Sequence, residues 1–320
     1  MEDVAAHDRQ TKQTEPQVMQ VDRIELPARA DGQRDEAAWL EMRKRDYTAS
    51  DVGKLWGVGL RGTELGVYLA KAGAKMDKPS QYTERGHVLE PVVAQRLLRR
   101  WPGASITATT VYLRGRDPDD PAMRIGATKD YDLVRGDQLD VLEIKTIAEF
   151  WFRRHWLRGG KVVPPDEVVW QVRTQAMLEG CAGGVIAAQV INAREDLHLF
   201  YVPRVPELEI QIQQRVAAFW RRFEAGLLPP LRYGHEAKAL DAMRREAAAS
   251  PPMLGDNRLA ELATAHATRT RAVAEAEAEL KKIEDEIRVL MGTNAVVMLP
   301  DARRITANKS GRRRVRIQPR

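Results

Sequence analysis

The pattern of apolar and polar positions along the chain predicts a protein of mixed helices and strands. Apolar residues spaced three and four apart indicate helices, and runs rich in β-branched residues indicate strands. Helices are predicted over 63–72, 84–100, 151–157, 165–179 and 207–224, and one more begins at Thr48, where Thr48 and Asp51 fit a capping box. Strands are predicted over 106–113, 123–134, 139–147, 185–191 and 197–202. This order predicts an α/β or α+β class with a mixed central sheet flanked by helices.

The C-terminal part of the chain shows a different pattern. Residues 256–291 read as one long helix whose apolar positions alternate by three and four residues, as in a coiled coil. These positions are Val273, Ala276, Leu280, Ile283, Ile287 and Leu290. Two to three heptads do not decide whether this helix pairs with a partner or folds back on its own domain. Gly292 ends the helix, and 295–299 and 314–317 are predicted to form a small hairpin.

The aromatic residues mark the limits of the main domain. All 19 lie between Trp39 and Tyr233, and large cores need aromatic side chains. We therefore expect five segments along the chain. They are a disordered acidic segment over 1–36, the main domain over 37–232, a linker over 233–255, a long amphipathic helix over 256–292, and a basic tail or small hairpin over 293–320.

Composition and charge narrow the class of protein. The chain has 320 residues, 43% hydrophobic and 30% charged, and no apolar run reaches the roughly 20 residues that a membrane span needs. Because the N-terminus is polar and acidic, we expect no targeting peptide and a cytoplasmic location. The net charge of +6 permits a nucleic-acid partner. Residues 301–320 carry eight Lys and Arg against one Asp, a tail that either binds phosphates or is a solvated end.

Several familiar site types are excluded or disfavoured. A single cysteine, Cys181, excludes a disulfide framework and a cysteine-based zinc or iron–sulfur site within one chain. The six histidines show no metal-ligand spacing. The segment from Gly57 to Gly62 matches GxGxxG, but a dinucleotide site needs a preceding strand, and here a helix precedes it. A loop that ends a helix is the better interpretation.

One group of charged residues has the composition of a hydrolytic site. Asp130 ends one predicted strand, and Glu143, Ile144 and Lys145 lie 13 to 15 residues later in the next. Alternate side chains of a strand share a face, so Glu143 and Lys145 point one way and Ile144 points into the core. Two carboxylates can hold Mg²⁺, which prefers hard oxygen ligands. Lys145 can orient a water molecule or stabilise developing negative charge.

Five motifs in order resemble one known family. They are Arg43 with Ser50 in Arg-Lys-Arg-Asp-Tyr-Thr-Ala-Ser, Gly86-His-Val-Leu-Glu90, Gly126-Ala-Thr-Lys-Asp130, Glu143-Ile-Lys145-Thr, and Gln171-Val-Arg-Thr-Gln175. Together, over about residues 39–225, they resemble the YqaJ-like, phage lambda-type exonuclease family of the PD-(D/E)xK nuclease superfamily. Lys129, Tyr131 and Arg173 depart from the family pattern, which has Pro and Gly around the aspartate and often a second glutamine in the helical motif.

The resemblance implies a restriction-endonuclease-like core and a set of site residues. The implied catalytic residues are Glu90, Asp130, Glu143, Lys145 and Gln171. The implied metal ligands, for Mg²⁺ with Mn²⁺ able to substitute, are Glu90, Asp130, Glu143 and the backbone carbonyl of Ile144. The implied DNA contacts are Arg43, Ser50, Thr128, Arg153, Arg154 and Gln175. For the segment from Trp151 to Trp156, a stacking and phosphate-binding role competes with an amphipathic helix whose Phe152 and Trp156 pack inward, which we favour.

The expected function follows from the same resemblance. It is Mg²⁺-dependent hydrolysis of linear double-stranded DNA from an end, 5′→3′, in phage-type recombination. The expected partners are DNA ends, a single-strand annealing recombinase and further copies of this chain, as in a ring-shaped trimer. An endonuclease of the same superfamily, an inactive DNA-binding protein and a coiled-coil adaptor remain as alternatives.

Overall fold

The computed structural model separates the chain into two units, Met1–Ala248 and Ala249–Arg320. It describes residues 19–27, 35–60, 62–74, 81–191, 196–232, 234–246, 257–301, 303–306 and 315–318. Much of the segment expected to be disordered, and part of the basic tail, lie outside the described residues. Within the described part of the chain, no helix combines the length and the hydropathy that would let it cross a membrane.

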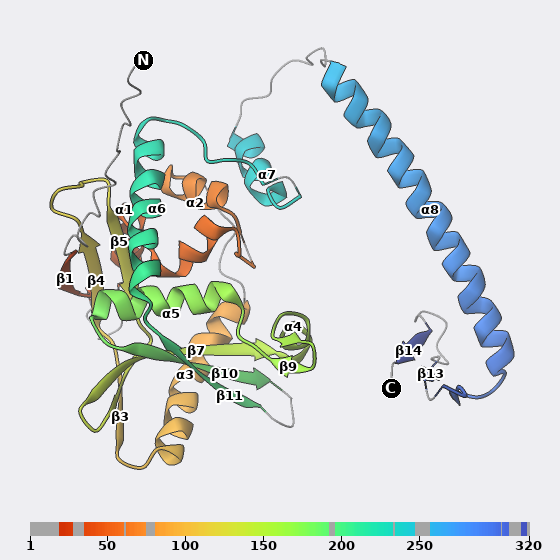
Figure 1. Cartoon of the computed structure of the whole chain (residues 1–320), viewed down its shortest axis with the longest axis horizontal. Coiled ribbons are helices and arrows are strands. Elements are labelled where there is room, and N and C mark those ends of the chain that lie inside the picture. The colour runs from red at the N-terminus through yellow and green to blue at the C-terminus, as the bar shows by residue number, and fades with distance from the viewer. Residues whose placement is uncertain are drawn as a thin grey trace, which may run out of the picture. The chain divides into compact units, whose positions relative to one another are not determined.

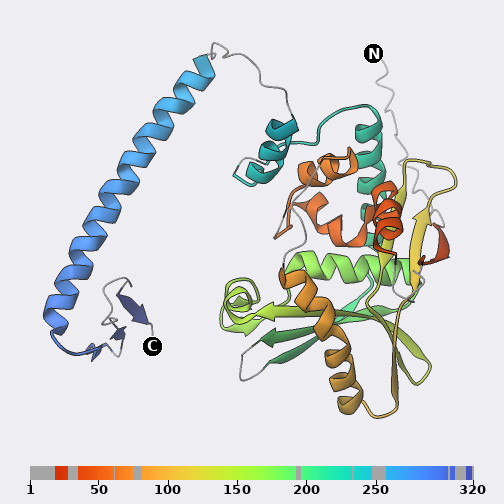
Figure 2. The same cartoon turned by 180° about the vertical axis from the view of Figure 1, so that it is seen from behind.

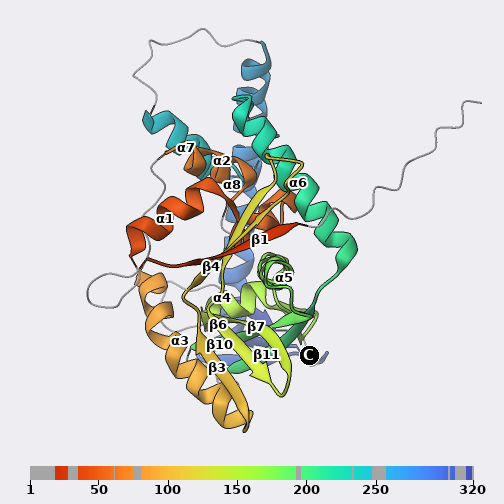
Figure 3. The ribbon, with the colours of Figure 1, turned by 90° about the vertical axis from the view of Figure 1, so that its left-hand side faces the viewer.

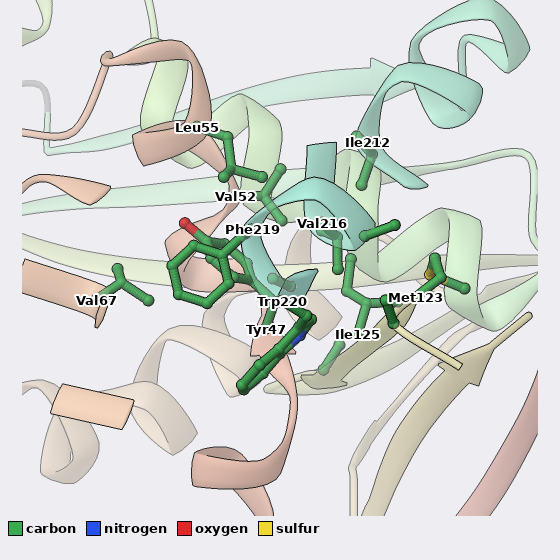
Figure 4. Packing of buried hydrophobic residues seen from close by; sticks show 14 of the residues in the cluster. Tyr47, Val52, Leu55, Val67, Met123, Ile125, Ile212, Val216, Phe219 and Trp220 are labelled. Carbon is green, nitrogen blue, oxygen red and sulfur yellow. The ribbon is translucent and has the colours of Figure 1, made fainter. Parts of the chain in front are cut away.

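The first sheet of unit 1 has four strands and lies beside three helical segments (Figure 1). Its order is β1 (Gln20–Glu25), β4 (Val111–Arg116), β5 (Arg124–Thr128) and β2 (Tyr47–Thr48). Helices α2 (Glu64–Lys71) and α6 (Pro206–Glu224) and the 3-10 helix η1 (Ala49–Trp56) share its core. Figure 4 shows Phe219 and Trp220 of α6 packed with Tyr47 and Ile125. This half of the unit owes its stability to aromatic burial.

The second sheet has five strands and carries a helix on each face. Its order is β11 (Leu197–Pro203), β10 (Gly183–Ile191), β7 (Gln138–Ala148), β6 (Tyr131–Arg135) and β3 (Ala104–Ala108). Strands β7 and β10 are parallel, and the other pairs are antiparallel. Helix α3 (Gln81–Arg100) passes behind this sheet in Figure 1 and in front of it in Figure 2, and α5 (Asp166–Glu179) packs on β10 and β7. The expected mixed sheet flanked by helices is confirmed.

Side chains on the two opposite faces of β7 belong to two separate apolar clusters. Leu142 and Ile144 pack with Val93 and Leu97 of α3. On the side of α5, Val172 packs in a cluster with Ile186 of β10. Helix α3 covers the first of these clusters. Its apolar face is narrower than the spacing of apolar residues in its sequence suggested, because Val88 and Val92 are 72% and 59% exposed.

Two of the predicted strands were wrong in their extent. The strand expected over 106–113 is divided between β3 and β4, and the strand expected over 123–134 is divided between β5 and β6. In both cases the chain passes from one sheet to the other (Figure 3). A run of β-branched residues favours extended backbone but does not specify which neighbour it pairs with. The crossing between β5 and β6 contains Lys129 and Asp130.

Two segments expected to be irregular form regular elements. Within 1–36, Gln20–Glu25 is strand β1, because its backbone pairs with the edge of β4. Within the expected linker, α7 (Ala237–Glu246) forms because Ala239 is buried and Met243 packs against the aromatic core. Neither β1 nor α7 contains an aromatic residue, so the aromatic limits missed both. The remaining elements of unit 1 are α1 (Glu36–Arg45), α4 (Glu149–His155), β8 (Leu157–Arg158) and β9 (Lys161–Val162).

Unit 2 consists of a long helix and a small sheet. Helix α8 (Asn257–Met291) has 35 residues and agrees with the expected helix over 256–291. Strands β12 (Val296–Met298), β13 (Arg304–Thr306) and β14 (Arg316–Gln318) follow in antiparallel order. The expected hairpin had the wrong pairing, because β13 lies between its two strands and buries Ile305.

Candidate active site

Asp130 lies at the crossing between the four-stranded and the five-stranded sheets of unit 1. Strand β5 ends at Thr128 and β6 begins at Tyr131, where Tyr131 pairs with Leu142 of β7. Beyond that pair the Asp130 side chain takes the place of a strand neighbour, since its Oδ2 accepts a hydrogen bond from the Ile144 N–H at 2.9 Å. The N–H and C=O of a strand residue point to the same side. The Ile144 carbonyl therefore also points toward Asp130.

Glu143 and Lys145 lie on the face of β7 that is covered by α5. Their side chains meet there, with Lys145 Nζ 2.5 Å from Glu143 Oε1. Ile144, between them, packs on the opposite face in the cluster with α3. The alternation of side chains along a strand thus predicted this arrangement correctly.

Helix α5 fixes Glu143 from above the sheet through two glutamines one turn apart. Gln171 Nε2 donates to Glu143 Oε1 at 2.7 Å, and Gln175 Nε2 donates to Glu143 Oε2 at 2.7 Å. Gln175 also donates to the Thr128 carbonyl at 3.0 Å and is fully buried. Gln175 was expected to contact DNA; in this structure its side chain is enclosed, and its donors are directed at Glu143 and β5.

The electrostatics of this group are those of crowded carboxylates. Burial raises the pKa of Asp130 well above its ordinary value, and the negative charges of Glu143 and Glu90 raise it further. Burial alone would lower the pKa of Lys145, but Glu143 and Asp130 hold it above its ordinary value. Asp130 and Glu143 together thus favour a nearby cation, and Lys145 supplies one positive charge.

The donor set fits a hard divalent cation held by few protein ligands. Asp130 and Glu143 offer carboxylate oxygens, and the Ile144 carbonyl points to the same side; Mg²⁺ prefers such ligands and keeps several waters. Among the described residues, no group of three or more His, Cys, Asp or Glu side chains converges as a metal cage. Glu90, on α3, lies 3.2 Å from the His87 ring through its carboxylate. It acts on Asp130 through charge rather than as a third converging ligand in this conformation.

The second part of the site is built by α1 and η1. Arg43 donates to Ser50 Oγ at 3.0 Å, and its guanidinium lies 4.5 Å over the Trp39 ring. Trp39 in turn donates to Thr128 Oγ1 at 2.9 Å, which joins α1 to the end of β5. The structure therefore brings together three of the residues expected to contact DNA, namely Arg43, Ser50 and Thr128.

Sequence reasoning missed the residues that support Arg43 and Ser50. Asp51 accepts from Thr48 Oγ1 and from Lys54 Nζ, both at 2.5 Å. Burial would raise the pKa of Asp51, but Lys54, Lys71 and Arg43 hold it well below its ordinary value. The Thr48-Asp51 pair was predicted only as a helix start, and the capping pattern was the one signal that pointed to it.

A pocket of about 530 Å³ opens beside Lys145 and Gln171. It is lined by Ser50, Leu60, Arg85, Lys145, Thr146, Ile147, Ala148, Phe150, Trp151, Trp156, Glu167, Val168 and Gln171. Glu167 was not predicted; it accepts from the Leu60 N–H at 2.8 Å and lies one turn before Gln171 on α5. The pocket thus joins Ser50 to Lys145 and Gln171, the two lining residues that contact Glu143.

The remaining predicted residues lie around this pocket rather than in it. Arg153 and Arg154 are exposed on α4, where Arg153 pairs with Glu149, while Phe152 and Trp156 pack inward as favoured. Lys129, which departs from the family pattern, is buried and pairs with Asp132 and with Glu179 at 2.5 Å. The Lys129 side chain therefore pairs with Asp132 and Glu179 and not with Asp130 or Glu143. Tyr131 packs in the cluster with α3.

The comparisons with known proteins can be set against this geometry. Residues 38–182 match the model of the YqaJ-like viral recombinase domain. No curated protein matches the chain. Two structures of an alkaline exonuclease, LHK-Exo, from Laribacter hongkongensis, one with dAMP, are 21% and 20% identical, with TM-scores of 0.45 and 0.47. Each match covers 59% of this chain and 93% of the LHK-Exo chain.

The structure of a phage-related exonuclease from Haemophilus somnus 129PT is 14% identical to this chain, with a TM-score of 0.40. The match covers 58% of this chain and 97% of the exonuclease chain. The matched segment 38–182 contains Arg43, Glu90, Asp130, Glu143 and Gln175, one residue from each of the five motifs. The resemblance found in those motifs is therefore confirmed, and residues 38–182 of the chain are similar to the YqaJ-like viral recombinase domain.

Proposed function

We propose that this protein is a divalent-metal-dependent deoxyribonuclease that degrades linear double-stranded DNA from its ends. The observation that carries the proposal is the meeting of Asp130, Glu143 and Lys145 beside the pocket that contains Ser50. Two carboxylates that can hold a metal ion and a lysine beside them are groups that phosphodiester hydrolysis uses. The match to the YqaJ-like viral recombinase domain supports DNA as the substrate.

Asp130, Glu143 and the Ile144 carbonyl would hold the ion, which we propose to be Mg²⁺, with Mn²⁺ able to substitute. When bound, such an ion polarises a phosphate and lowers the pKa of water. Lys145, held at Glu143, is placed to orient the attacking water or to stabilise negative charge on the phosphate. Gln171 and Gln175 keep Glu143 in one position before the substrate arrives.

Arg43 and Ser50 supply the phosphate-binding part of the proposed site. A guanidinium presents a planar fork of donors that suits phosphate oxygens. The hydrogen bond between Arg43 and Ser50, with the Trp39 ring under the guanidinium, holds both donors at the pocket edge. A terminal phosphate bound there would fix the DNA end relative to Asp130 and Glu143, which supports an exonuclease over an endonuclease.

Digestion of labelled duplexes tests the proposal. Wild-type protein with Mg²⁺ is expected to release nucleotides from linear duplex and to leave a closed circle intact, with no turnover in EDTA. Glu143→Gln keeps the shape of the side chain but removes its charge, and we expect a loss of at least about 100-fold. Glu279→Gln, at an exposed position of α8 outside the proposed site, is the matched control. Labels at the 5′ or 3′ end report the polarity, which we propose to be 5′→3′.

The alternatives give different results in the same assay. Nicking of the closed circle would indicate an endonuclease. Salt-dependent binding of DNA without turnover in the wild type would indicate an inactive DNA-binding protein. From the resemblance we also propose a role in phage-type recombination with a single-strand annealing protein, and a ring-shaped trimer. Light scattering of the purified chain tests the trimer directly.

A further inference from the structure

A second pocket in unit 1 has a strongly basic lining. Its volume is about 300 Å³. It is lined by Lys44, Arg45, Asp46, Lys71, Arg114, Arg116, Arg124, Trp220 and Phe223, and we call it the basic pocket. Six of these nine residues are cations, and they come from α1, α2, β4 and β5. Segments far apart in the sequence therefore bring positive charge to one place.

The one acidic residue of the lining is already neutralised. Asp46 is 2% exposed and accepts from Arg114 Nε at 2.7 Å and from the Tyr112 hydroxyl at 3.0 Å. The Asp46 carboxylate therefore binds two side chains of β4 and holds this strand against the end of α1. It does not offset the other five cations of the basic pocket.

The carboxylates that pair with the rim cations are between one third and three fifths exposed. Lys44 pairs with Glu41, and both side chains are more than half exposed. Arg116 pairs with Asp22 of β1, and Arg124 pairs with Glu224 at 2.8 Å while lying 3.9 Å over the Trp220 ring. Exposed pairs of this kind contribute about 0–1 kcal/mol. A phosphate can therefore replace these carboxylates at little cost.

Lys71 lies at the floor of the basic pocket and adds to its positive charge. Lys71 Nζ donates to the carbonyls of Arg43 at 2.5 Å and Asp46 at 2.7 Å. Burial, together with the nearby Arg43 charge, lowers the pKa of Lys71 to about 8. A bound anion would stabilise the charged form of this buried amine.

The basic pocket and the active-site pocket lie on either side of Arg43. The Arg43 carbonyl accepts from Lys71 in the basic pocket, whereas its guanidinium donates to Ser50, which lines the active-site pocket. Lys44 and Arg45 follow Arg43 directly in the last turn of α1. A nucleic-acid strand that places one phosphate at Arg43 would therefore run toward the basic pocket.

We propose that the basic pocket binds the phosphodiester backbone of the DNA substrate, at a phosphate away from the bond that is cleaved. This proposal rests on the proposed nuclease function and adds a second contact to it. Phosphate contacts of this kind fix the register of a protein on DNA without reading its sequence. The basic pocket would thus hold the duplex while the end is processed next to Arg43.

A competing explanation is that cations at the end of α1 only complement the helix dipole. Helix α3 offers a matched pair, because Arg99 and Arg100 are exposed cations in its own last turn. The test compares Lys44→Gln/Arg45→Gln with Arg99→Gln/Arg100→Gln in the full chain. Both double variants remove two exposed positive charges from the last turn of a helix. Thermal unfolding of both checks that each is folded.

Binding is measured by fluorescence anisotropy of a labelled duplex in EDTA over a series of salt concentrations. We expect Lys44→Gln/Arg45→Gln to bind about tenfold more weakly and to lower the salt slope by about 2, one for each phosphate that the variant no longer neutralises. We expect Arg99→Gln/Arg100→Gln to change the affinity by less than about twofold. With Mg²⁺, the first pair should raise KM for a long linear duplex.

Three outcomes separate the ideas. Equal losses in both double variants would overturn the proposal, because general charge would then explain them. Loss of binding of inorganic phosphate in Lys44→Gln/Arg45→Gln with unchanged duplex affinity would overturn it too, since the basic pocket would then be a site for small anions. If the wild type cleaves no DNA but the two variants still differ in EDTA, the nuclease function fails and the basic pocket stands.

Discussion

Glu143 is the residue on which most of the local interactions converge. It is 2% exposed, and a carboxylate so enclosed is costly unless each oxygen has partners. Lys145 and Gln171 contact Oε1, and Gln175 contacts Oε2. These donors fix the carboxylate before any substrate arrives, which is the arrangement that favours electrostatic catalysis.

Replacing Gln175 tests this positioning. Gln175→Leu removes the donor to Glu143 Oε2 and to the Thr128 carbonyl, and it leaves both acceptors buried without that partner. We expect a loss of about 2 kcal/mol of unfolding free energy and about a 100-fold loss of nuclease activity. Urea unfolding and duplex digestion measure these. Gln214→Leu, at an exposed position of α6, should change neither; wild-type activity in Gln175→Leu would show that Glu143 needs no such support.

Lys71 gives a pH dependence of stability whose sign can be worked out. Its pKa is about 8 in the folded chain against an ordinary 10.5, so between these values the unfolded chain binds more protons at this position. Stability then rises with pH in this window. Relative to Lys71→Met, the wild type should gain about 2 kcal/mol between about pH 7.5 and pH 9.5, measured by urea unfolding. A constant difference would mean that burial does not lower the pKa of Lys71; Lys281→Met, at an exposed position of α8, is the control.

At the scale of elements, α5 is the helix that assembles the proposed active site. Glu167, Gln171 and Gln175 are spaced by four residues and so share one side of it. Trp170, on the same helix, stacks on Trp56 of η1 with ring centroids 4.1 Å apart. Helix α5 therefore connects β7, which carries Glu143, to η1, which carries Ser50.

The fit of α5 on the sheet depends on Gly184 of β10. A methyl group there would lie 2.5 Å from Val172 Cγ1 and 3.0 Å from the Val141 carbonyl oxygen. Gly184→Ala should therefore push α5 away from Glu143, with a loss of about 2 kcal/mol of unfolding free energy and a lower nuclease rate. Gly86→Ala adds the same methyl group in open space on α3. It should raise stability by up to about 1 kcal/mol. Equal stability of the two variants would contradict the tight fit.

Local patterns predicted the parts of the site that lie within one element. The period of two along β7 placed Glu143 and Lys145 on one face and Ile144 on the other, and the four-residue step of α5 placed Gln171 one turn from Gln175. The same patterns did not reveal that the runs 106–113 and 123–134 each serve two sheets. Pairing partners are set by tertiary contacts, which no single run of residues encodes.

Contacts between elements were beyond the reach of sequence patterns. The network of Arg43, Thr48, Asp51 and Lys54 joins α1, β2 and η1, and Glu167 reaches Leu60 across 107 positions. The burial of Gln175 is another such case, because an amide on a helix gives no sign of whether its side chain faces solvent or a strand. Its family motif alone suggested a DNA contact.

At the scale of the whole molecule, the chain consists of two units with separate internal contacts. Every residue of the proposed active site lies in unit 1. The apolar seam of α8 is exposed at Val273, Leu280 and Ile283, by 56%, 48% and 55%. Unit 2 thus carries an exposed apolar seam and none of the residues of the proposed active site.

Truncation tests this division. A chain ending at Ala248 keeps both sheets and all proposed site residues, so we expect it to fold and to digest linear duplex at a rate within about threefold of the full chain. Circular dichroism and the duplex assay measure this. The full-length chain with Glu143→Gln serves as the inactive reference. An unfolded or inactive truncated chain would show that unit 2 supports catalysis.

The crossing at Asp130 has one further consequence. Asp130 follows the last strand of the aromatic-rich sheet, whereas Glu143 belongs to the other sheet, so the two carboxylates report on the relative placement of both halves of unit 1. A slip of one sheet against the other by a single hydrogen-bond length would separate them while leaving each half folded. On heating, nuclease activity should therefore be lost at a lower temperature than the circular dichroism signal of helices and strands. Nuclease activity is then the more sensitive measure of how the two halves of unit 1 are joined.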